Sequence, residues 1–197
     1  MSNDINILIV YYSRDGHVHA MAEHLARGVE LETHCYARLR TVPPWGSPAD
    51  AIPESGPVYV EKSDLRECAG LALGSPTRFG NMAAALKAFL DSTSDIWLSG
   101  ELADKPAAVF TSSTSMHGGQ ESTLLSMMLP LIHHGMVMVG IPYTQPGLLN
   151  TTAGGTPYGA SHVAADNGNV SITATEKELC IALGKRLAGI AKKLHGE

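Results

Sequence analysis

The first feature of the sequence that could do chemistry is a turn suited to binding phosphate. It lies between an apolar run at residues 5–12 and a helical pattern that starts at residue 18. A helix N-terminus offers unpaired N–H groups and a partial positive charge, and both suit a phosphate. The dinucleotide motif G-x-G-x-x-G and the P-loop motif are absent, so an ordinary strand-to-helix turn is the alternative. The turn comprises Ser13, Arg14, Asp15, Gly16, His17 and Val18.

Two further loops follow apolar runs at 69–74 and 105–110. In the first, residues 74–81, Arg78 is a permanent cation beside the flat face of Phe79, which suits a planar, partly anionic ligand such as a flavin ring. In the alternative, Phe79 caps the core and Arg78 is solvated. The second loop, residues 112–120, presents donors that could edge a ring system. It includes Ser113, Thr114, Ser115, Met116, His117 and Gly118.

Several other motifs are rejected. Adjacent His133 and His134 would point about 100° apart on a helix, so they cannot share a metal as an i, i+4 pair would. Residues 159–163 form a broken G-x-S-x-G with no strand before it and no helix after it, which argues against a hydrolase. We therefore expect no metal site and no nucleophilic hydrolase centre.

The pattern of the chain predicts the elements that position these loops. Continuous apolar runs are typical of strands covered on both faces, as in a parallel sheet. Alternation at 32–40 indicates an edge strand, and apolar spacings of three and four indicate helices. We expect an α/β, doubly wound sheet of five parallel strands with helices on both faces, which binds ligands beyond the carboxyl ends of its strands. The expected strands span residues 5–12, 32–40, 69–74, 105–110 and 136–141, and the expected helices cover 18–29, 82–90, 124–132 and a final stretch opened by a capping box at Thr175 and Glu178.

The 197 residues predict a single domain, 1–197. Residues 41–57 hold five of the eleven prolines and form a loop excursion. Residues 142–174 are rich in Gly, Thr and Asn and form a long loop of the kind that is often functional.

Composition narrows the class of protein. Hydrophobic residues make up 44% and charged residues 17%, an ordinary globular balance. A net charge of −5 without a basic run argues against a nucleic-acid partner. No apolar stretch approaches the roughly 20 residues of a membrane span, and three widely spaced cysteines favour a reducing compartment. We expect a soluble, cytoplasmic protein.

Five sequence blocks then resemble a known family. They are SRDGHV, GSPTRFGNM, TSSTSMHGGQES, LPLIHHGMVMVGIPY and GGTPYGASH, in order and at family spacing. They are similar to those of the WrbA-type NAD(P)H:quinone oxidoreductases, FMN-dependent relatives of flavodoxin. This resemblance implies that the doubly wound five-stranded sheet is flavodoxin-like.

The resemblance implies roles for individual residues. The turn from Ser13 to Val18 matches the FMN-phosphate loop, and Asp15 falls at a position associated with the nicotinamide cofactor, although many members have an aromatic or neutral residue there. Trp97 matches an aromatic residue that lines the substrate pocket. The remaining FMN contacts implied are Thr77, Arg78, Phe79, Ser113, Thr114, Ser115, Met116, His117, Gly118 and His133.

The function implied is two-electron reduction of a quinone by NADH or NADPH through FMN, with ping-pong kinetics. A flavodoxin-type electron carrier is one alternative, although carriers are usually far more acidic than −5. An NAD(P)H-dependent FMN or azo reductase is another, and a flavin-binding regulatory protein is a third.

The resemblance also implies a homo-oligomer, expected to be a tetramer. Trp97 is expected in a loop with no evident core role, and His133 near the end of a helix, away from its own strand-end loops. A neighbouring subunit's flavin could lie beside both residues. Local packing of Trp97 and helix capping by His133 are the alternative.

Overall fold

A parallel sheet organises the molecule. The computed structural model describes residues 4–48, 51–164 and 171–195. The strands follow the order β2-β1-β3-β4-β5, and every pairing is parallel, so the expected doubly wound α/β sheet is confirmed. A further strand, β6, pairs with β4. The strands are β1 (Ile5–Tyr11), β2 (Cys35–Thr41), β3 (Gly70–Pro76), β4 (Pro106–Ser113), β5 (Val137–Met138) and β6 (Ala160–Val163).

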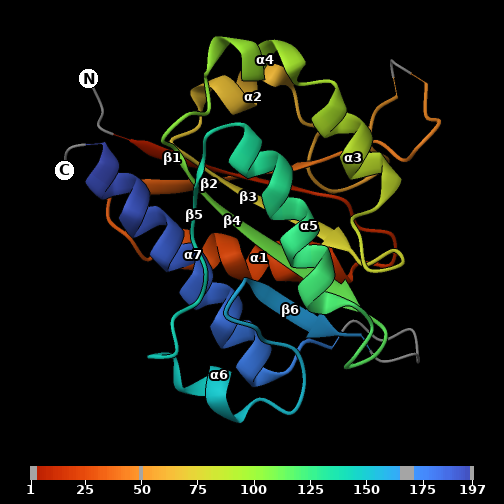
Figure 1. Cartoon of the computed structure of the whole chain (residues 1–197), viewed down its shortest axis with the longest axis vertical. Helices are drawn as coiled ribbons and strands as arrows, with labels where there is room; N and C mark the ends of the chain where they lie inside the picture. Colours follow the sequence, from red (N-terminus) through yellow and green to blue (C-terminus); the bar gives the residue numbers. More distant parts are fainter. Residues whose placement is uncertain (1–3, 49–50, 165–170, 196–197) are drawn as a thin grey trace.

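Helices cover both faces of this sheet (Figure 1). Because β1 alternates its side chains between the two faces, Ile7 and Ile9 join one apolar cluster while Leu8 and Val10 join the other. The first cluster is closed by α1 and α7, and the second by α2, α3 and α5. The helices are α1 (His17–Val29), α2 (Lys62–Glu67), α3 (Ala84–Asp91), α4 (Ser94–Ser99), α5 (Gln120–His133), α6 (Pro146–Asn150) and α7 (Ala174–Leu194).

The fifth position of the sheet differs from the expectation. Only Val137–Met138 of the expected strand at 136–141 pairs with β4, next to its first residues. The rest of that edge is taken by β6, which pairs with Phe110–Ser113 of β4. The segment 142–174, expected to be a loop, therefore contains both α6 and β6.

Three local expectations were wrong. The capping box of α7 is formed by Thr173 and Glu176 rather than by Thr175 and Glu178. Trp97 lies in the short helix α4 rather than in a loop. The third and fourth strands also continue beyond their apolar runs, to Pro76 and Ser113. They can do so because the buried hydroxyls of Ser75 and Thr111 have hydrogen-bond partners. Ser75 Oγ accepts from the N–H of Ala83, and Thr111 Oγ1 donates to the carbonyl of Ser75.

Substitution of Phe110 tests how tightly β4 is packed between the helices that cover it. Its side chain has no solvent exposure, whereas that of Phe79 is fully exposed. We expect Phe110→Ala to lower the free energy of unfolding by about 3–5 kcal/mol, and the matched control Phe79→Ala to change it by less than about 0.5 kcal/mol. Urea denaturation of the flavin-free protein measures both values. Equal effects of the two substitutions would contradict this description of the core.

Candidate functional site

The three predicted loops meet at one edge of the sheet. They follow β1, β3 and β4, which are neighbours, so parallel pairing brings their carboxyl ends together. The N–H of Tyr12 donates to the carbonyl of Gly74 at 3.0 Å, and the N–H of Thr77 donates to that of Ser112 at 2.8 Å. These bonds join the first loop to the second and the second to the third. Figure 1 shows this edge at the lower right.

The first loop leaves the N-terminus of α1 open. Gly16, at the N-cap, has φ of 86° and supplies no side-chain cap, so the N–H groups of His17 and Val18 have no carbonyl within the helix to bind. Ser13 Oγ accepts from the N–H of His19 at 3.3 Å and fixes the start of the turn. The carboxylate of Asp15 lies 3.9 Å from Arg14, and both side chains are well exposed. A phosphate placed here would meet backbone donors.

The second loop is a tight turn that projects Phe79 into solvent. Arg78 and Asn81 exchange backbone hydrogen bonds of 2.7 and 3.0 Å, and the two residues between them have positive φ, 52° for Phe79 and 74° for Gly80. Positive φ is rare for a bulky residue. The alternative in which Phe79 caps the core is therefore wrong, because its side chain is fully exposed. An exposed aromatic ring held on a strained turn is typical of a ligand-contacting position.

The third loop has an anchored base and an exposed tip. Ser113 Oγ donates to the carbonyl of Ser115 at 2.7 Å, and the amide of buried Gln120 donates to the carbonyl of Met116 at 3.2 Å. The hydroxyl of Thr77 lies 2.7 Å from that of Thr123, which ties the first turn of α5, directly after this loop, to the second loop. The tip exposes Thr114, Ser115, Met116 and His117.

A chain of three side chains, two of them buried, reaches the first loop from the side of β6 and α7. His17 Nδ1 lies 3.1 Å from His162 Nε2, and His162 Nδ1 lies 3.0 Å from Glu176 Oε2. His162 and Glu176 have no solvent exposure. Burial alone would raise the pKa of Glu176, but hydrogen bonds from His162 and three backbone N–H groups bring it down to about 2. The pKa of His17 is lowered by burial and by His162, against the opposing effect of Asp15.

Sequence reasoning missed both buried members of this chain. His162 lies in the segment rejected as a hydrolase motif, and β6 holds it there. Glu176 was overlooked because two Thr-x-x-Glu pairs overlap at the start of α7. The pair Thr173 and Glu176 was the available signal, since a Glu at the third helical position of a capping box has a fixed backbone partner.

Trp97 and His133 lie together, but away from the three loops. Trp97 Nε1 donates to the carbonyl of His133 at 2.8 Å, and both side chains are exposed. Helix α5 starts beside the third loop and spans 14 residues, or about 20 Å, before it reaches His133 near the first residues of β4. The structure therefore brings these two residues to the opposite edge of the sheet.

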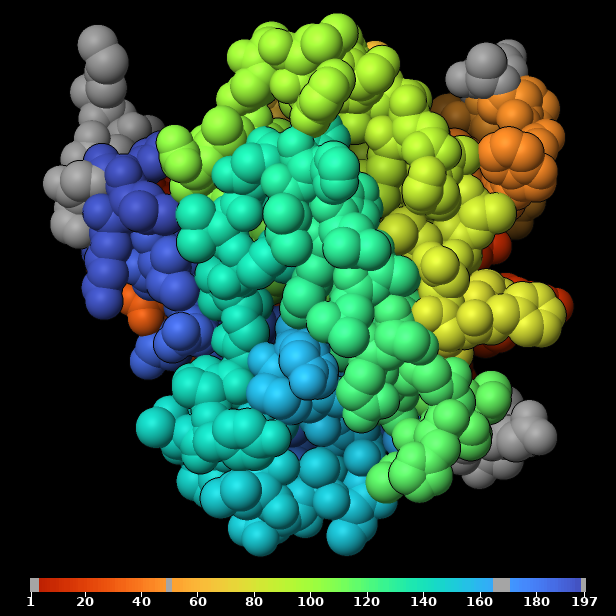
Figure 2. Space-filling model, in the orientation of Figure 1, coloured from red at the N-terminus to blue at the C-terminus, as the bar shows by residue number. Residues whose placement is uncertain are grey.

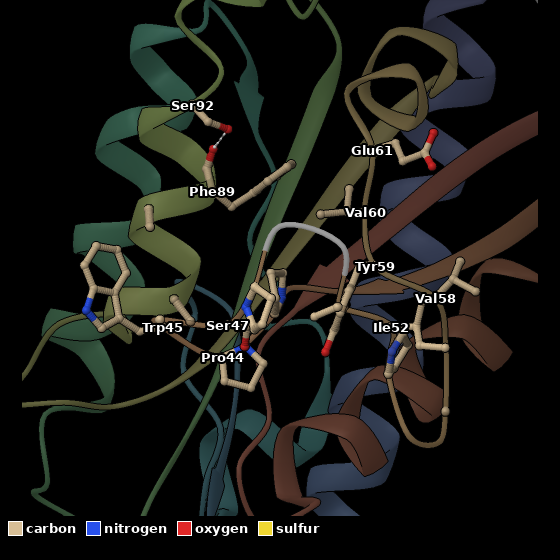
Figure 3. Close-up of a pocket in the computed structure, with 18 residues that line it drawn as sticks. Pro44, Trp45, Ser47, Ile52, Val58, Tyr59, Val60, Glu61, Phe89 and Ser92 are labelled. Atoms are coloured by element: carbon tan, nitrogen blue, oxygen red, sulfur yellow. Dashed lines mark hydrogen bonds between the residues drawn. The ribbon is translucent and has the colours of Figure 1, made fainter.

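A cavity of about 990 Å³ lies outside this group of loops. It is formed by the proline-rich excursion and α3, with Trp45 and Phe89 on one side and Ile52 and Val58 on the other (Figure 3). None of the predicted site residues lines it. Within residues 4–48, 51–164 and 171–195, no group of three or more His, Cys, Asp or Glu side chains could hold a metal ion.

Comparison with known proteins decides the family. The family model described as NADPH-dependent FMN reductase matches residues 13–144, which include all three loops. The chain belongs to this family. Two relatives named NAD(P)H dehydrogenase (quinone) are each 41% identical, one from Geobacter sulfurreducens over 98% of this chain and 100% of its own, the other from Geotalea daltonii over 96% and 98%.

Solved structures agree on the fold. A flavodoxin, WrbA-like protein from Agrobacterium tumefaciens has a TM-score of 0.70 at 25% identity, with 96% of this chain and 99% of that chain covered. A flavodoxin from the domain Archaea has a TM-score of 0.66 at 20% identity, with 95% and 99% covered, which supports the fold alone.

The three loops fit FMN. Open N–H groups and the side chain of His17 at the first loop suit its single phosphate. Arg78 is a permanent cation next to the exposed ring of Phe79, and this pair suits a flat, electron-accepting ring system. Hydrogen-bond donors at the tip of the third loop suit the polar edge of such a ring. The residues present therefore match both the anionic and the planar part of this cofactor.

The pH dependence of the free energy of unfolding tests the lowered pKa of the buried Glu176 carboxylate. The pKa of Glu176 is about 2 in the folded protein against 4.5 ordinarily, so its charge stabilises the fold above pH 4.5 and this contribution is lost as the pH falls from 4.5 towards 2. The contribution is about 3 kcal/mol. We expect Glu176→Gln to reduce the free energy of unfolding at pH 7 and to approach the wild-type value as the solution is acidified.

The matched control is Glu178→Gln, an exposed position on the same helix. Urea denaturation from pH 7 down to pH 3 gives both comparisons. A pH-independent difference between the Glu176→Gln variant and wild type would contradict the lowered pKa.

Proposed function

We propose that the protein is an FMN-dependent NAD(P)H:quinone oxidoreductase. FMN, when bound, accepts a hydride from NADH or NADPH and passes two electrons to a quinone. The observation that carries the proposal is the meeting of the three loops around the projecting turn at Phe79, in a chain 41% identical to proteins named NAD(P)H dehydrogenase (quinone) over nearly its full length.

Each loop has a proposed part. The turn from Ser13 to Val18 holds the phosphate, and the segments Thr77 to Phe79 and Ser113 to Gly118 hold the ring. The guanidinium of Arg78, which donates to the carbonyl of Thr77 at 2.8 Å, stabilises negative charge on the ring. Asp15, exposed at the rim beside Arg14, is the proposed contact of the nicotinamide cofactor.

One set of assays tests this function. We expect the purified protein to contain FMN rather than FAD when its flavin is extracted and chromatographed, because one open helix N-terminus neutralises one terminal phosphate. Steady-state rates with varied NADH and a soluble quinone are expected to give the parallel double-reciprocal lines of ping-pong kinetics. Turnover with free FMN but not with quinone would favour the FMN reductase alternative, and no turnover with either acceptor would favour an electron carrier.

A homo-oligomer, which we take to be a tetramer, accounts for the positions of Trp97 and His133. Helix α5 exposes Leu125, Leu129 and Ile132, whose spacings of four and three residues place them along one face of the helix. Neighbouring α4 adds exposed Leu98 and half-exposed Trp97. Figure 2 shows α5 across the front of the molecule, with α4 above it. An apolar face of this kind is suited to contact with a second copy.

The oligomer also supplies the substrate pocket in this proposal. Since α5 separates His133 from the loops of its own chain by about 20 Å, neither His133 nor Trp97 reaches its own flavin site. Contact between copies would bring both residues of one chain to the loops of another, where they line the slot that the nicotinamide and the quinone occupy in turn.

The protein is proposed to act in the cytoplasm. In the described part of the chain, no helix is both long and apolar enough to cross a bilayer. No disulfide joins the three cysteines, all of which are buried, as is usual in a reducing compartment.

Mixing of defective subunits tests the shared pocket. One variant, Arg78→Ala, is impaired in its own loops, and the other, Trp97→Ala with His133→Ala, is impaired in what it supplies to a neighbour. We expect each to have low quinone reductase activity alone. Unfolding and refolding them together at equal concentrations is expected to restore about a quarter of the sites.

The control is each variant refolded alone by the same procedure. A pocket shared between subunits would be contradicted if the mixture were no more active than the mean of the two variants. It would also be contradicted if the wild-type protein sedimented as a monomer under conditions in which it is fully active.

A further inference from the structure

The chain from Glu176 through His162 to His17 has a defined hydrogen-bonding direction. Glu176 Oε1 accepts from the N–H groups of Gly154 and Val163, at 2.8 and 2.9 Å. Its Oε2 accepts from the N–H of Thr173 at 2.9 Å and lies 3.0 Å from His162 Nδ1. A carboxylate has no hydrogen to give, so His162 Nδ1 must carry the proton of this last bond.

That assignment determines what His17 presents to the solvent side of the loop. If the two rings hold no extra proton, His162 Nε2 is a bare acceptor, His17 Nδ1 donates to it, and His17 Nε2 is left as a lone pair. If the rings hold one extra proton, it lies either on His17 Nε2 or between the rings with His162 Nε2 donating to His17 Nδ1. In both cases His17 Nε2 carries a hydrogen.

The positive charge of the extra proton is balanced by the buried carboxylate of Glu176. Glu176 and His162 are fully buried, and the carboxylate is the negative charge nearest to the two rings on the side of β6 and α7. On the loop side, Asp15 also favours the protonated form of His17, although Asp15 is exposed and paired with Arg14. In the described part of the chain, no hydrogen bond to His17 Nε2 is formed, so this atom remains available to a ligand at the N-terminus of α1.

We propose that Glu176 and His162 form a buried relay that orients His17 and stabilises the proton, taken up from solution, with which His17 Nε2 binds the phosphate of the flavin. Glu176 and His162 are thus positioning residues, since they act through His17. The proposal rests on the proposed function, in which residues 13–18 hold the phosphate. It adds that phosphate binding takes up a proton and that this uptake depends on His162 of β6, 145 positions further along the chain, and on Glu176 of α7.

The consequence is a pH dependence specific to the phosphate. The phosphate of FMN remains largely dianionic above about pH 6.5, so changes at higher pH report on the protein. Because the pKa of His17 is lowered by burial and by His162, the flavin-free protein holds little of the extra proton at such pH, so phosphate binding takes that proton up from solution and becomes less favourable as the pH rises. Affinity for FMN is therefore expected to fall as the pH rises above about 6.5, whereas affinity for riboflavin, which has no phosphate, stays nearly constant.

The experiment measures the ratio of FMN affinity to riboflavin affinity by flavin fluorescence quenching on the flavin-free protein. We expect His17→Gln to lower the ratio about tenfold at pH 6.5, as for loss of one charge-assisted hydrogen bond, and to remove its pH dependence. His162→Gln is expected to do the same, and the double variant to lose no more than either single variant. The matched control is His24→Gln, two turns further along α1, which is expected to keep the wild-type ratio.

Each outcome is decisive. A His162→Gln variant with the wild-type affinity ratio and the wild-type pH dependence of that ratio would overturn the relay while leaving the phosphate loop intact, as would losses that add in the double variant. Equal wild-type affinities for FMN and riboflavin would overturn the phosphate loop as well.

A measurement on the wild type avoids any dependence on variant folding. In nitrogen-15 spectra, inorganic phosphate is expected to move protonation of His17 Nε2 to higher pH, and an unchanged titration would overturn the proposal.

Discussion

Parallel hydrogen bonding among β1, β3 and β4 is the constraint on which the rest of this molecule depends. These three strands pair from Ile7 opposite Gly70 through to Pro76 opposite Ser112, so all of them end at the same edge. Each strand is buried on both faces, and the chain can return to the next strand only through a helix. Loops far apart in the sequence are thereby brought together, and one helix N-terminus points at the same place.

The same constraint separates the two groups of predicted site residues. A helix that starts at the carboxyl edge must end near the amino edge, and α5 does so after 14 residues. His133 is consequently displaced from the loops of its own chain, and its neighbour Trp97 is held beside it by a 2.8 Å hydrogen bond. An apolar face on α5 and α4 lies next to this pair. The proposed oligomer follows from this geometry together with the need for a pocket over the flavin.

The sequence predicted those features that depend on local pattern. The apolar run of β1 predicted a strand covered on both faces. The meeting of the three loops after β1, β3 and β4 follows from the fact that these strands are neighbours in the sheet. The sequence did not reveal β6, because Ala160–Val163 is four residues long and follows a glycine-rich segment. Its strand character comes from pairing with β4, a tertiary interaction that no local window contains.

The buried relay was missed for a related reason. His162 is polar in a short segment without periodicity, and nothing in the sequence places it against Glu176 or His17. Its environment is created when β6 takes the place of a continuous fifth strand and α7 packs across it. Trp97 was assigned to a loop because α4 has only six residues, too few to establish a helical period. In each case, long-range contacts decided the structure.

The most direct measurement of the central claim is a map of backbone amide chemical shifts as FMN is added to the flavin-free protein. The account predicts that the changes concentrate in residues 13–18, 77–79 and 113–118, and that riboflavin reproduces those at 77–79 and 113–118 while leaving 13–18 nearly unchanged. Changes concentrated instead at residues 43–60 and along α3, around the cavity formed by the proline-rich excursion, would contradict it.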